Sequence, residues 1–515
     1  MPTYTLTVID TPGIQSYIFG SNRLRENIGA SELVRRVTTL WPLELLQQAG
    51  DANVRGGKIE DGLHIEDGAL AAEVIYLGGG NALILFRERA RAVQFVTALS
   101  RRVVEEAPGL ELAVAHTEVA WEQLAAGVDA AMKTLARVKN SRQSSAPLLG
   151  LSVTAACEST GLVATTLARH QGGAYPVSDA VRAKLAWAEE AENRLRGIFS
   201  EDFHRTGYQF PRDFEEFGRK GEMSYIAVVH ADGNGMGQFF RQIGQKHLTN
   251  AREYIQAVRA ASRAVERASQ KALRQLGDAL LAPMLEDKNK FRPLVFGGDD
   301  VTFVCDGRLG LTLAALYLEA FEAATGAEPV LGELHACAGV AVVKTHYPFA
   351  RAYGLSEALA KSSKSYVRGC VKKGEQDFSA LDWHFATSGL LGSLEELRKR
   401  EYWVRAGHLA MRPLRLRAAR GEWQTWPAFT GVVEEFKKRE KEQRNKIIAL
   451  REALREGPAA VKKYRQDFTF ALPVLDASLH DLQETGWHGD RCGYFDAIEA
   501  LDFYTPLTGD EDGNL

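Results

Sequence analysis

The stretch that decides the fold reads YIAVVHADGNGMGQFF, from Tyr225 to Phe240. Its first part is an apolar run typical of a strand, and we expect this strand to end at Asp232. Three glycines then follow before a segment that we expect to be helical, which is the composition of a tight turn into a helix. The stretch therefore predicts a strand, a glycine turn and a helix, with one carboxylate at the end of the strand.

A second carboxylate-bearing segment follows further along the chain. The run RPLVFGGDDVTFVC, residues 292–305, places Gly-Gly-Asp-Asp between two β-rich runs. Two such runs around a short glycine-containing segment predict a β-hairpin. After the hairpin we expect a helix at 309–324, a strand at 334–343 and a helix that carries Lys361 and Lys364.

The same series of elements occurs earlier in the chain. The stretch YTLTVIDTPGIQSYIF, residues 4–19, aligns with the first one so that Asp10 falls on Asp232, and VIYLGGGNALILF, residues 74–86, stands in place of the hairpin. A helix, a strand and a helix ending in Lys139 follow. The order strand, helix, hairpin, helix, strand, helix predicts an antiparallel sheet with helices packed on one face. The predicted fold class is therefore α/β (α+β), with two ferredoxin-like domains of the polymerase palm kind.

The remaining segments complete the division of the chain. A polar loop begins at Asn140, and after about residue 384 the pattern becomes helical and more basic. We predict a first palm domain at 1–139, a mostly helical linking domain at 140–222, a second palm domain at 223–383 and a helical C-terminal domain at 384–515.

Composition indicates an ordinary soluble globular protein. The 63 Lys and Arg residues nearly balance the 66 Asp and Glu residues, which argues against a surface that is basic throughout and coats a polyanion. The five cysteines are scattered and form no CxxC pair, as in a reducing cytoplasm. No stretch approaches the ~18 uninterrupted apolar residues that cross a bilayer. We expect a cytoplasmic protein without membrane contact.

The chemistry is expected at the carboxylates of the second copy. Asp232 ends a strand, and Asp299 and Asp300 occupy the turn of the hairpin, which an adjacent position in the sheet would bring close together. Hard carboxylate oxygens without soft ligands suit Mg²⁺ or Mn²⁺. Two such ions can promote in-line attack on phosphorus by neutralising the attacking and leaving oxygens. We predict that these three residues are catalytic metal ligands.

Small residues next to the carboxylates are expected to hold a nucleotide. Glycines leave backbone N–H groups accessible to a triphosphate, and a helix N-terminus adds positive potential. The predicted nucleotide-binding positions are Gly233, Asn234, Gly235, Gly237, Gly297 and Gly298. Lys361 and Lys364 could supply charge to the outer phosphates, or could be solvated lysines of a helix.

The first copy keeps the glycines and loses the charges. Gly78, Gly79, Gly80 and Asn81 stand where the second copy has Gly-Gly-Asp-Asp. We expect this copy to hold a nucleotide without metal catalysis, and the alternative that it is only a structural partner stays open. Asp10 alone cannot hold a pair of metal ions.

The sequence resembles a known family at these motifs. The resemblance is carried by GIQSYIFGSNRLRENIGASELV (13–34), HADGNGMG (230–237), FGGDD (296–300) and ACAGVAVVKTHYPFARAYGLSEALAKSSK (336–364). These stretches are similar to the large subunit of type III CRISPR effector complexes, the CRISPR polymerase/cyclase family.

The resemblance implies a reaction and partners. Pockets between two palms would bind two ATP molecules, and metals on the second palm would promote attack of a 3′-hydroxyl on an α-phosphate with loss of pyrophosphate. The products would be 3′–5′ cyclic oligoadenylates, second messengers of antiviral defence. In this chain Asp232 and Asp299 would bind metal beside Asp300, and Lys364 would contact the outer phosphates. Guide RNA and other type III effector subunits would be the partners.

Two departures from the family pattern carry expectations of their own. Many members begin with a His-Asp nuclease domain, whereas this chain begins at the first palm, so we do not expect DNA cleavage. Many also hold zinc with paired cysteines, whereas AACESTGLVAT (155–165) keeps only Cys157, so zinc is not expected.

Rival interpretations remain open at this point. The chain could be a catalytically idle scaffold whose palms only bind nucleotide, or a related synthase that joins ATP to S-adenosylmethionine or makes a cyclic dinucleotide. Residues 398–420 hold eight Lys or Arg against one Glu, with Trp403, Trp423 and Trp426 nearby. This stretch could contact RNA or a partner subunit, or could be a solvated helical face.

Overall fold

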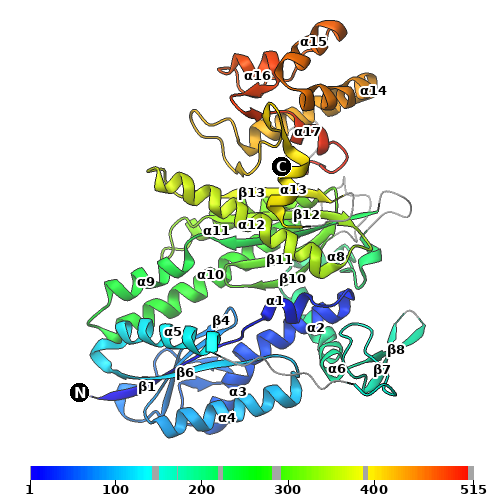
Figure 1. Ribbon diagram of the computed structural model, residues 1–515. Coiled ribbons are helices and arrows are strands. Elements are labelled where there is room, and N and C mark those ends of the chain that lie inside the picture. Colours follow the sequence, from blue (N-terminus) through cyan, green and yellow to red (C-terminus); the bar gives the residue numbers. More distant parts are fainter. Residues whose placement is uncertain are drawn as a thin grey trace.

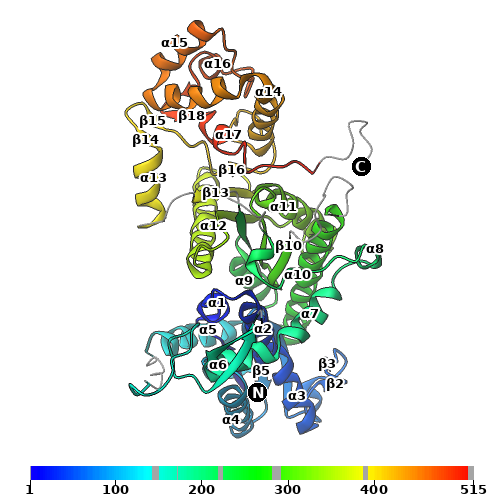
Figure 2. The ribbon, with the colours of Figure 1, turned by 90° about the vertical axis from the view of Figure 1, so that its right-hand side faces the viewer.

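The computed structural model describes residues 2–141, 150–170, 172–217, 224–280, 291–386 and 392–507. Its parts are stacked along one long axis, with the N-terminal sheet at one end, a larger central sheet in the middle and the C-terminal helices at the other end (Figures 1 and 2). No helix among these residues has the length and apolar character needed to cross a bilayer.

The N-terminal half is built on a four-stranded antiparallel sheet in the order β4-β5-β1-β6. Its strands are β1 (Thr3–Asp10), β4 (Ala72–Gly78), β5 (Asn81–Phe86) and β6 (Ala113–Ala120). Its helices are α1 (Ile14–Phe19), α2 (Leu24–Arg35), the π-helical turn η1 (Arg36–Leu40), α3 (Trp41–Ala49), α4 (Arg89–Glu106) and α5 (Leu124–Ser141), with 3₁₀ turns η2 (Ile65–Asp67) and η3 (Trp121–Gln123). A small hairpin, β2 (Val54–Arg55) and β3 (Lys58–Ile59), follows α3.

The central half repeats this sheet and extends it. The strand order is β10-β11-β9-β12-β13-β16, and its first four strands are antiparallel in the same chain order as those of the N-terminal sheet. These strands are β9 (Tyr225–Gly233), β10 (Phe291–Gly297), β11 (Asp300–Asp306), β12 (Ala336–Lys344), β13 (Ala380–Ala386) and β16 (Leu414–Arg415). β13 runs parallel to β12. The predicted boundary at 383 therefore falls inside a strand of the central sheet, and the one at 222 lies outside the described residues.

Helices cover both faces of each sheet, so the prediction of helices on one face was wrong. In the central half α9 (Met236–Lys246), α10 (Ala251–Ala279) and α11 (Gly310–Gly326) precede α12 (Phe349–Lys372). α10 and α11 pack on one face of the sheet, and α12 packs on the other. Successive residues of β9 are buried on both sides, which a sheet exposed on one face would not require. In the N-terminal half α4 and α5 likewise lie on opposite faces.

The two halves contact each other reciprocally. α1 of the N-terminal half packs on α12, where Phe19 stacks on Tyr353 with ring centroids 3.9 Å apart. α9 of the central half packs on α5. In addition, Arg259 of α10 is buried and bonds to Glu73 of β4 at 2.7 Å. The halves therefore share a core, and each places its first helix against the last helix of the other.

The linking segment and the C-terminal region are less purely helical than predicted. The linking segment contains a hairpin, β7 (Thr166–His170) and β8 (Gly173–Val177), before α6 (Asp179–Ala186), α7 (Ala188–Arg196), α8 (Glu201–Arg205) and η4 (Phe214–Glu216). The C-terminal region contains α13 (Leu394–Tyr402), α14 (Trp426–Glu456), α15 (Pro458–Phe468), α16 (His480–Thr485) and α17 (Phe495–Glu499). Four two-residue strands add a small sheet: β14 (Trp403–Val404), β15 (Gly407–His408), β17 (Trp487–His488) and β18 (Arg491–Cys492).

The basic stretch 398–420 is largely engaged inside the fold. Five of its arginines form ion pairs: Arg398 with Asp382, Arg400 with Glu401, Arg412 with Asp496, Arg415 with Glu375 and Arg417 with Glu322. Trp423 and Trp426 are buried, whereas Trp403 is exposed. Three of these pairs, those of Arg398, Arg415 and Arg417, reach residues of the central half.

Candidate active site

The structure brings the three predicted carboxylates together at one edge of the central sheet. Asp300, the first residue of β11, pairs directly with Asp232 of β9. The backbone N–H of Gly233 donates to the carbonyl oxygen of Asp299 at 3.2 Å. A Cβ atom on Gly233 would lie only 3.0 Å from Oδ2 of Asp299, so this close approach requires glycine. Residues that are about 70 positions apart in the chain thus form one acidic cluster.

The acidic cluster holds an excess of negative charge. Burial, together with the neighbouring carboxylates of Asp232 and Asp300, raises the pKa of Asp299 to about 7. Burial and the charge of Asp232 likewise raise the pKa of Asp300 to about 7. The Asp300 side chain is 40% exposed, but its Oδ1 atom is fully buried and has no hydrogen-bond donor among the described residues. The acidic cluster therefore combines raised carboxyl pKa values with a buried carboxylate oxygen that has no hydrogen-bond donor among the described residues.

His230 lies beneath Asp300 and does not compensate this charge. The ring is buried, and Nδ1 lies 3.1 Å from the hydroxyl of Thr302 and 3.3 Å from Oδ1 of Asp300. Burial lowers the pKa of His230, so the imidazole is neutral at pH 7. The contact of His230 with the acidic cluster is a feature that sequence reasoning missed.

Lys364 is the lysine that contacts the cluster directly. Its Nζ donates to Oδ2 of Asp232 at 2.5 Å and to the carbonyl oxygen of Gly233 at 2.8 Å. Lys361, which is 69% exposed, pairs with Glu357 on its own helix at 2.8 Å. α12 therefore places Lys364 on the carboxylate and Lys361 at the rim of the site.

The glycine turn leaves space beside the cluster, with one exception. Gly235 begins α9 in the left-handed conformation, with φ at 64°, and a Cβ on Gly235, Gly237, Gly297 or Gly298 would meet no atom within 4 Å. Asn234 instead turns away, because its side chain donates to Oδ1 of Asp377 at 3.0 Å and to the carbonyl oxygen of Phe378 at 3.1 Å. The glycines suit a backbone cradle for a ligand, whereas Asn234 anchors the turn to the protein.

Two residues of the N-terminal half reach the site, and sequence reasoning missed both. Gln15 of α1 lines a cavity of about 120 Å³ together with Asp232, Asp300, Lys361 and Lys364. Tyr76 of β4 lies near Asp299, since burial and then the charge of Asp299 raise its pKa. The signal that could have identified them is the internal repeat, but the repeat does not reveal how its two copies pack.

The N-terminal half presents a weaker counterpart of the site. Asp10 pairs with Asn81 across β1 and β5, as Asp232 pairs with Asp300. Nζ of Lys139 lies 2.7 Å from Oδ2 of Asp10. Gly78, Gly79 and Gly80 all have positive φ. At the position that corresponds to the acidic cluster, this half therefore has one carboxylate, that of Asp10, which is already paired with Lys139.

The donor set of the acidic cluster fits a hard divalent cation. Asp232, Asp299 and Asp300 offer carboxylate oxygens, and the carbonyl oxygen of Gly233 lies beside them. Among the described residues, the group whose ligand atoms all lie within 4.8 Å of one another is Glu322, Glu333 and His335, and the three aspartates do not form such a group. The fit of the aspartates rests on their uncompensated charge and on the buried Oδ1 of Asp300.

Comparison with known proteins identifies the domain that carries this site. The family model described as Cas10/Cmr2, second palm domain, matches residues 225–371. That range contains the acidic cluster and Lys364. The resemblance to the large subunit of type III CRISPR complexes is thereby confirmed at this domain. No curated protein matches the chain.

Solved structures extend the likeness to the fold of nearly the whole chain. They are described as a Csm1-Csm4 cassette in complex with one ATP (TM-score 0.54), the same cassette in complex with cA3 (TM-score 0.53) and a Csm1-Csm4 subcomplex of the type III-A CRISPR-Csm interference complex (TM-score 0.52). Each is 14% identical to this chain, and each alignment covers 98% of this chain and 70% of the solved one. The chain is therefore similar to these proteins in fold.

Proposed function

From the match of residues 225–371 to a Cas10/Cmr2 second palm domain, we propose that this chain is a nucleotidyltransferase that converts ATP into 3′–5′ cyclic oligoadenylate. The observation that carries the proposal is the acidic cluster, in which three carboxylates share one sheet edge with a single lysine contact. Mutual repulsion among buried carboxylates is unfavourable, which is a reason to expect a cationic ligand at this edge. A catalytically idle scaffold has no need of such a cluster.

In this proposal, different residues of the site bind the metal ions and the triphosphate. Asp232, Asp299 and Asp300 would hold Mg²⁺ or Mn²⁺. When bound, such ions neutralise the attacking and leaving oxygens of phosphoryl transfer. The open backbone at Gly235, Gly297 and Gly298 would receive the triphosphate of ATP near the N-terminus of α9.

Lys364 and Gln15 would act on the bound nucleotide. Lys364 would neutralise charge at the phosphates when a metal takes over its contact with Asp232. Gln15 reaches the same cavity from the N-terminal half and would orient one of the two reacting nucleotides. A 3′-hydroxyl oxygen then attacks the α-phosphorus of the neighbouring ATP, the bond to the β-phosphate oxygen breaks, pyrophosphate leaves and the hydroxyl proton passes to solvent.

We further propose that the N-terminal half is a degenerate palm that holds a nucleotide without metal. Its strand order and its glycine hairpin at Gly78–Gly80 support this role. The proposed partners are guide RNA and other subunits of a type III effector complex. The solved complexes with one ATP and with cA3, whose fold this chain resembles, support both the substrate and the product class.

The test is incubation of the purified chain with ATP and Mg²⁺, with and without a guide RNA and its target. We expect release of pyrophosphate and mass spectra of cyclic adenylates. A double variant, Asp299→Asn with Asp300→Asn, should release none, whereas the matched control Asp10→Asn should retain turnover because Asp10 is paired with Lys139 and belongs to no acidic cluster.

Each rival gives a different result in the same assay. A scaffold releases no pyrophosphate from the unaltered protein under either condition. A synthase with another nucleophile releases pyrophosphate only when S-adenosylmethionine is added, or yields a dinucleotide mass. Any of these three results would overturn the proposed product.

A further inference from the structure

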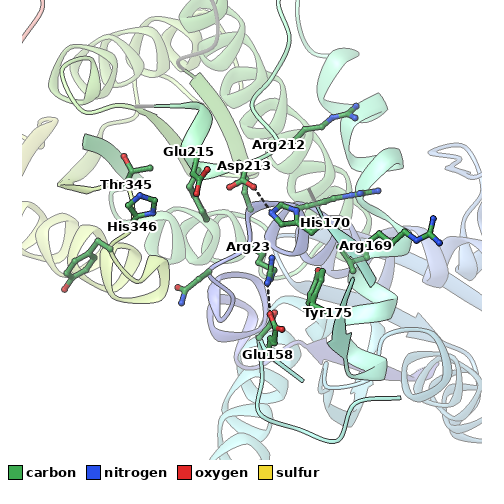
Figure 3. Close-up of a pocket in the computed structure, with 17 residues that line it drawn as sticks. Arg23, Glu158, Arg169, His170, Tyr175, Arg212, Asp213, Glu215, Thr345 and His346 are labelled. Atoms are coloured by element: carbon green, nitrogen blue, oxygen red, sulfur yellow. Dashed lines mark hydrogen bonds and ion pairs between the residues drawn. The ribbon is translucent and has the colours of Figure 1, made fainter. Parts of the chain in front are cut away.

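A cavity of about 380 Å³ lies where three parts of the chain meet (Figure 3). Residues 22–25 at the start of α2 form one wall. Residues of the linking segment between 158 and 175, and residues 212–215, form a second wall. The turn 345–347, directly before α12, forms the third. We refer to it as the junction cavity. It shares no lining residue with the cavity beside the acidic cluster.

The charges around the junction cavity are unbalanced. Arg23 pairs with Glu158 at 2.8 Å, and in a second pair Nε2 of His170 lies 3.0 Å from Oδ2 of Asp213; Figure 3 draws both pairs. The first pair neutralises the carboxylate of Glu158, and Asp213 is the second of the three lining carboxylates. Glu215 is the third.

Three further arginines line the cavity and are exposed: Arg25, Arg169 and Arg212. Within the described ranges, none of their guanidinium groups has a hydrogen bond or an ion pair to a protein group. Besides the paired Arg23 and Glu158, the lining therefore carries three guanidinium groups against two carboxylates, those of Asp213 and Glu215. Such an excess, gathered from α2, β7 and the segment before η4, is an arrangement that attracts an anion.

Two of the hydroxyls that line the cavity already have partners within the protein. The hydroxyl of Ser159 donates to Glu26 at 2.8 Å, and that of Thr345 lies 2.6 Å from the hydroxyl of Ser224. The aromatic ring of Tyr175 lies under Arg23, whose guanidinium carbon is 3.9 Å from the ring centroid. An occupant of this cavity would be recognised chiefly by its negative charge.

The N-terminus of α12 adds to this positive potential. Asn22 lines the cavity, and its Oδ1 accepts the backbone N–H of Phe349, the first residue of the helix. Phe349 also stacks on Phe214 of the cavity lining, with ring centroids 4.5 Å apart. The positive end of a long helix dipole is thus fixed at the wall of the cavity formed by the turn 345–347.

We propose that the junction cavity binds a phosphate-bearing nucleotide ligand through Arg25, Arg169 and Arg212. The planar guanidinium fork matches phosphate oxygens bidentately. The volume lies within the range of small-ligand sites, which is roughly 300–1,000 Å³, and suits one or two nucleotide units. The phosphate groups could belong to a free nucleotide or to a segment of single-stranded RNA, and the experiment distinguishes the two.

The helix α12 connects the junction cavity to the acidic cluster. The cavity turn 345–347 runs directly into α12, and the same helix carries Lys364, which holds Asp232. A bound phosphate would therefore connect the linking segment to the helix on which the catalytic lysine sits. The binding itself does not depend on the proposed reaction, and it is measured without turnover.

The test is fluorescence anisotropy of 5′-labelled hexauridylate RNA titrated with the full-length chain in EDTA. The variant Arg169→Glu with Arg212→Glu should bind about 10-fold or more weakly, with a shallower dependence on salt. The matched control is Arg182→Glu with Arg205→Glu, since both arginines are exposed in the same linking segment and lie outside the cavity. Its affinity should stay within about twofold of the unaltered protein. Equal affinity of the two double variants would overturn the proposal.

Competition separates the two ligand sources. Displacement of the labelled RNA by ATP or by the phosphorylated dinucleotide pUpU identifies a free nucleotide as sufficient, whereas displacement only by unlabelled hexauridylate identifies RNA. Failure of every probe to bind the unaltered chain overturns the proposal in both forms.

A measurement on the unaltered chain avoids any folding defect of a variant. Hydrogen exchange should slow at residues 345–352 when the competing ligand saturates the protein, because the ligand would contact the turn and the first turn of α12. Unchanged exchange at this segment under saturation would contradict the site.

Discussion

In the N-terminal half Asp10 lies opposite Asn81, and in the central half Asp232 lies opposite Asp300. The four strands that the two sheets have in common follow the same order, and the first strand of each hairpin has its bulge at the corresponding place. The halves therefore differ little in backbone and strongly in charge. The comparison teaches that the sheet alone does not make the site, because the same sheet exists once with an acidic cluster and once without it.

The hairpin turns differ in one backbone detail that reinforces the difference in charge. Gly78 and Gly79 have φ of 148° and 57°, and their counterparts Gly297 and Gly298 have φ of 158° and 67°. The next residue is Gly80 with φ at 84° in the N-terminal half, but Asp299 without a positive φ in the central half. The N-terminal turn therefore uses a conformation that disfavours an aspartate at this position.

Removal of the carboxylates should have the largest effect and should separate the halves completely. Asp299→Ala is expected to lower the rate of pyrophosphate release from ATP roughly 100-fold or more, because it would remove one of the proposed metal ligands of the proposed phosphoryl transfer. Asp10→Ala should change the rate less than about fivefold, since Asp10 is neutralised by Lys139 and belongs to no cluster. Steady-state rates of both variants check the comparison, and equal losses in the two would remove the distinction between the halves.

The sequence supported a correct prediction of the repeated sheet and of the acidic cluster, because both follow from local patterns. Alternating apolar residues end at Asp232, and a glycine pair precedes Asp299 in a hairpin. The extension of the central sheet could not be found in this way. β13 follows the long helix α12 and pairs in parallel with β12, so no tight turn marks it in the sequence.

Contacts between distant segments explain the other features of the structure that the sequence did not predict. The basic stretch 398–420 gave a prediction of a charged surface from local composition, yet Arg412 is fully buried against Asp496 at 2.6 Å, 84 residues further along the chain. Gln15 and Tyr76 belong to the site only because α1 and β4 face the central half. Local patterns contain no information on such pairings, which depend on how the two halves pack.

The introduction of an aspartate at Gly80 tests the difference in backbone conformation between the two hairpin turns. Gly80→Asp should lower the free energy of unfolding by about 1–2 kcal/mol, because an aspartate would adopt a positive φ. A Cβ at this position would also lie 2.4 Å from Cδ1 of Ile14, which would have to move. Asn81→Asp is the control, since Asn81 lies in a regular strand and should be nearly neutral. Urea denaturation gives both values, and equal stability of Gly80→Asp and the unaltered protein would show that the turn adapts freely.

The pH dependence of stability should distinguish the halves by about 1 kcal/mol. The pKa of Asp299 is raised to about 7, so its carboxyl group binds a proton more tightly in the folded chain than in the unfolded one. Its cost to stability is therefore absent below about pH 4 and fully present above about pH 7. In EDTA at pH 8, Asp299→Asn should be more stable than the unaltered protein by about 1 kcal/mol after allowance for solvent screening, and this gain should vanish toward pH 4.

The control for the pH experiment comes from the other half. Asp10→Asn removes a carboxylate that already has Lys139 beside it and should give no gain at pH 8. Addition of Mg²⁺ should abolish the advantage of Asp299→Asn, because the unaltered cluster then gains a cation. A gain that grows on acidification would contradict the sign of this argument.

The smallest effect concerns the two lysines that contact the paired aspartates. Lys139 is 41% exposed and makes one ion pair with Asp10, whereas Lys364 is 13% exposed and also donates to the carbonyl oxygen of Gly233. Lys139→Met should change the free energy of unfolding by no more than about 0.5 kcal/mol, because an exposed ion pair contributes little. Lys364→Met should cost more, since it leaves a carbonyl oxygen and a carboxylate without their donor. Chemical denaturation of both variants at pH 7 gives this difference, and an equal or larger loss for Lys139→Met would show that the N-terminal pair is as important to the fold as the central one.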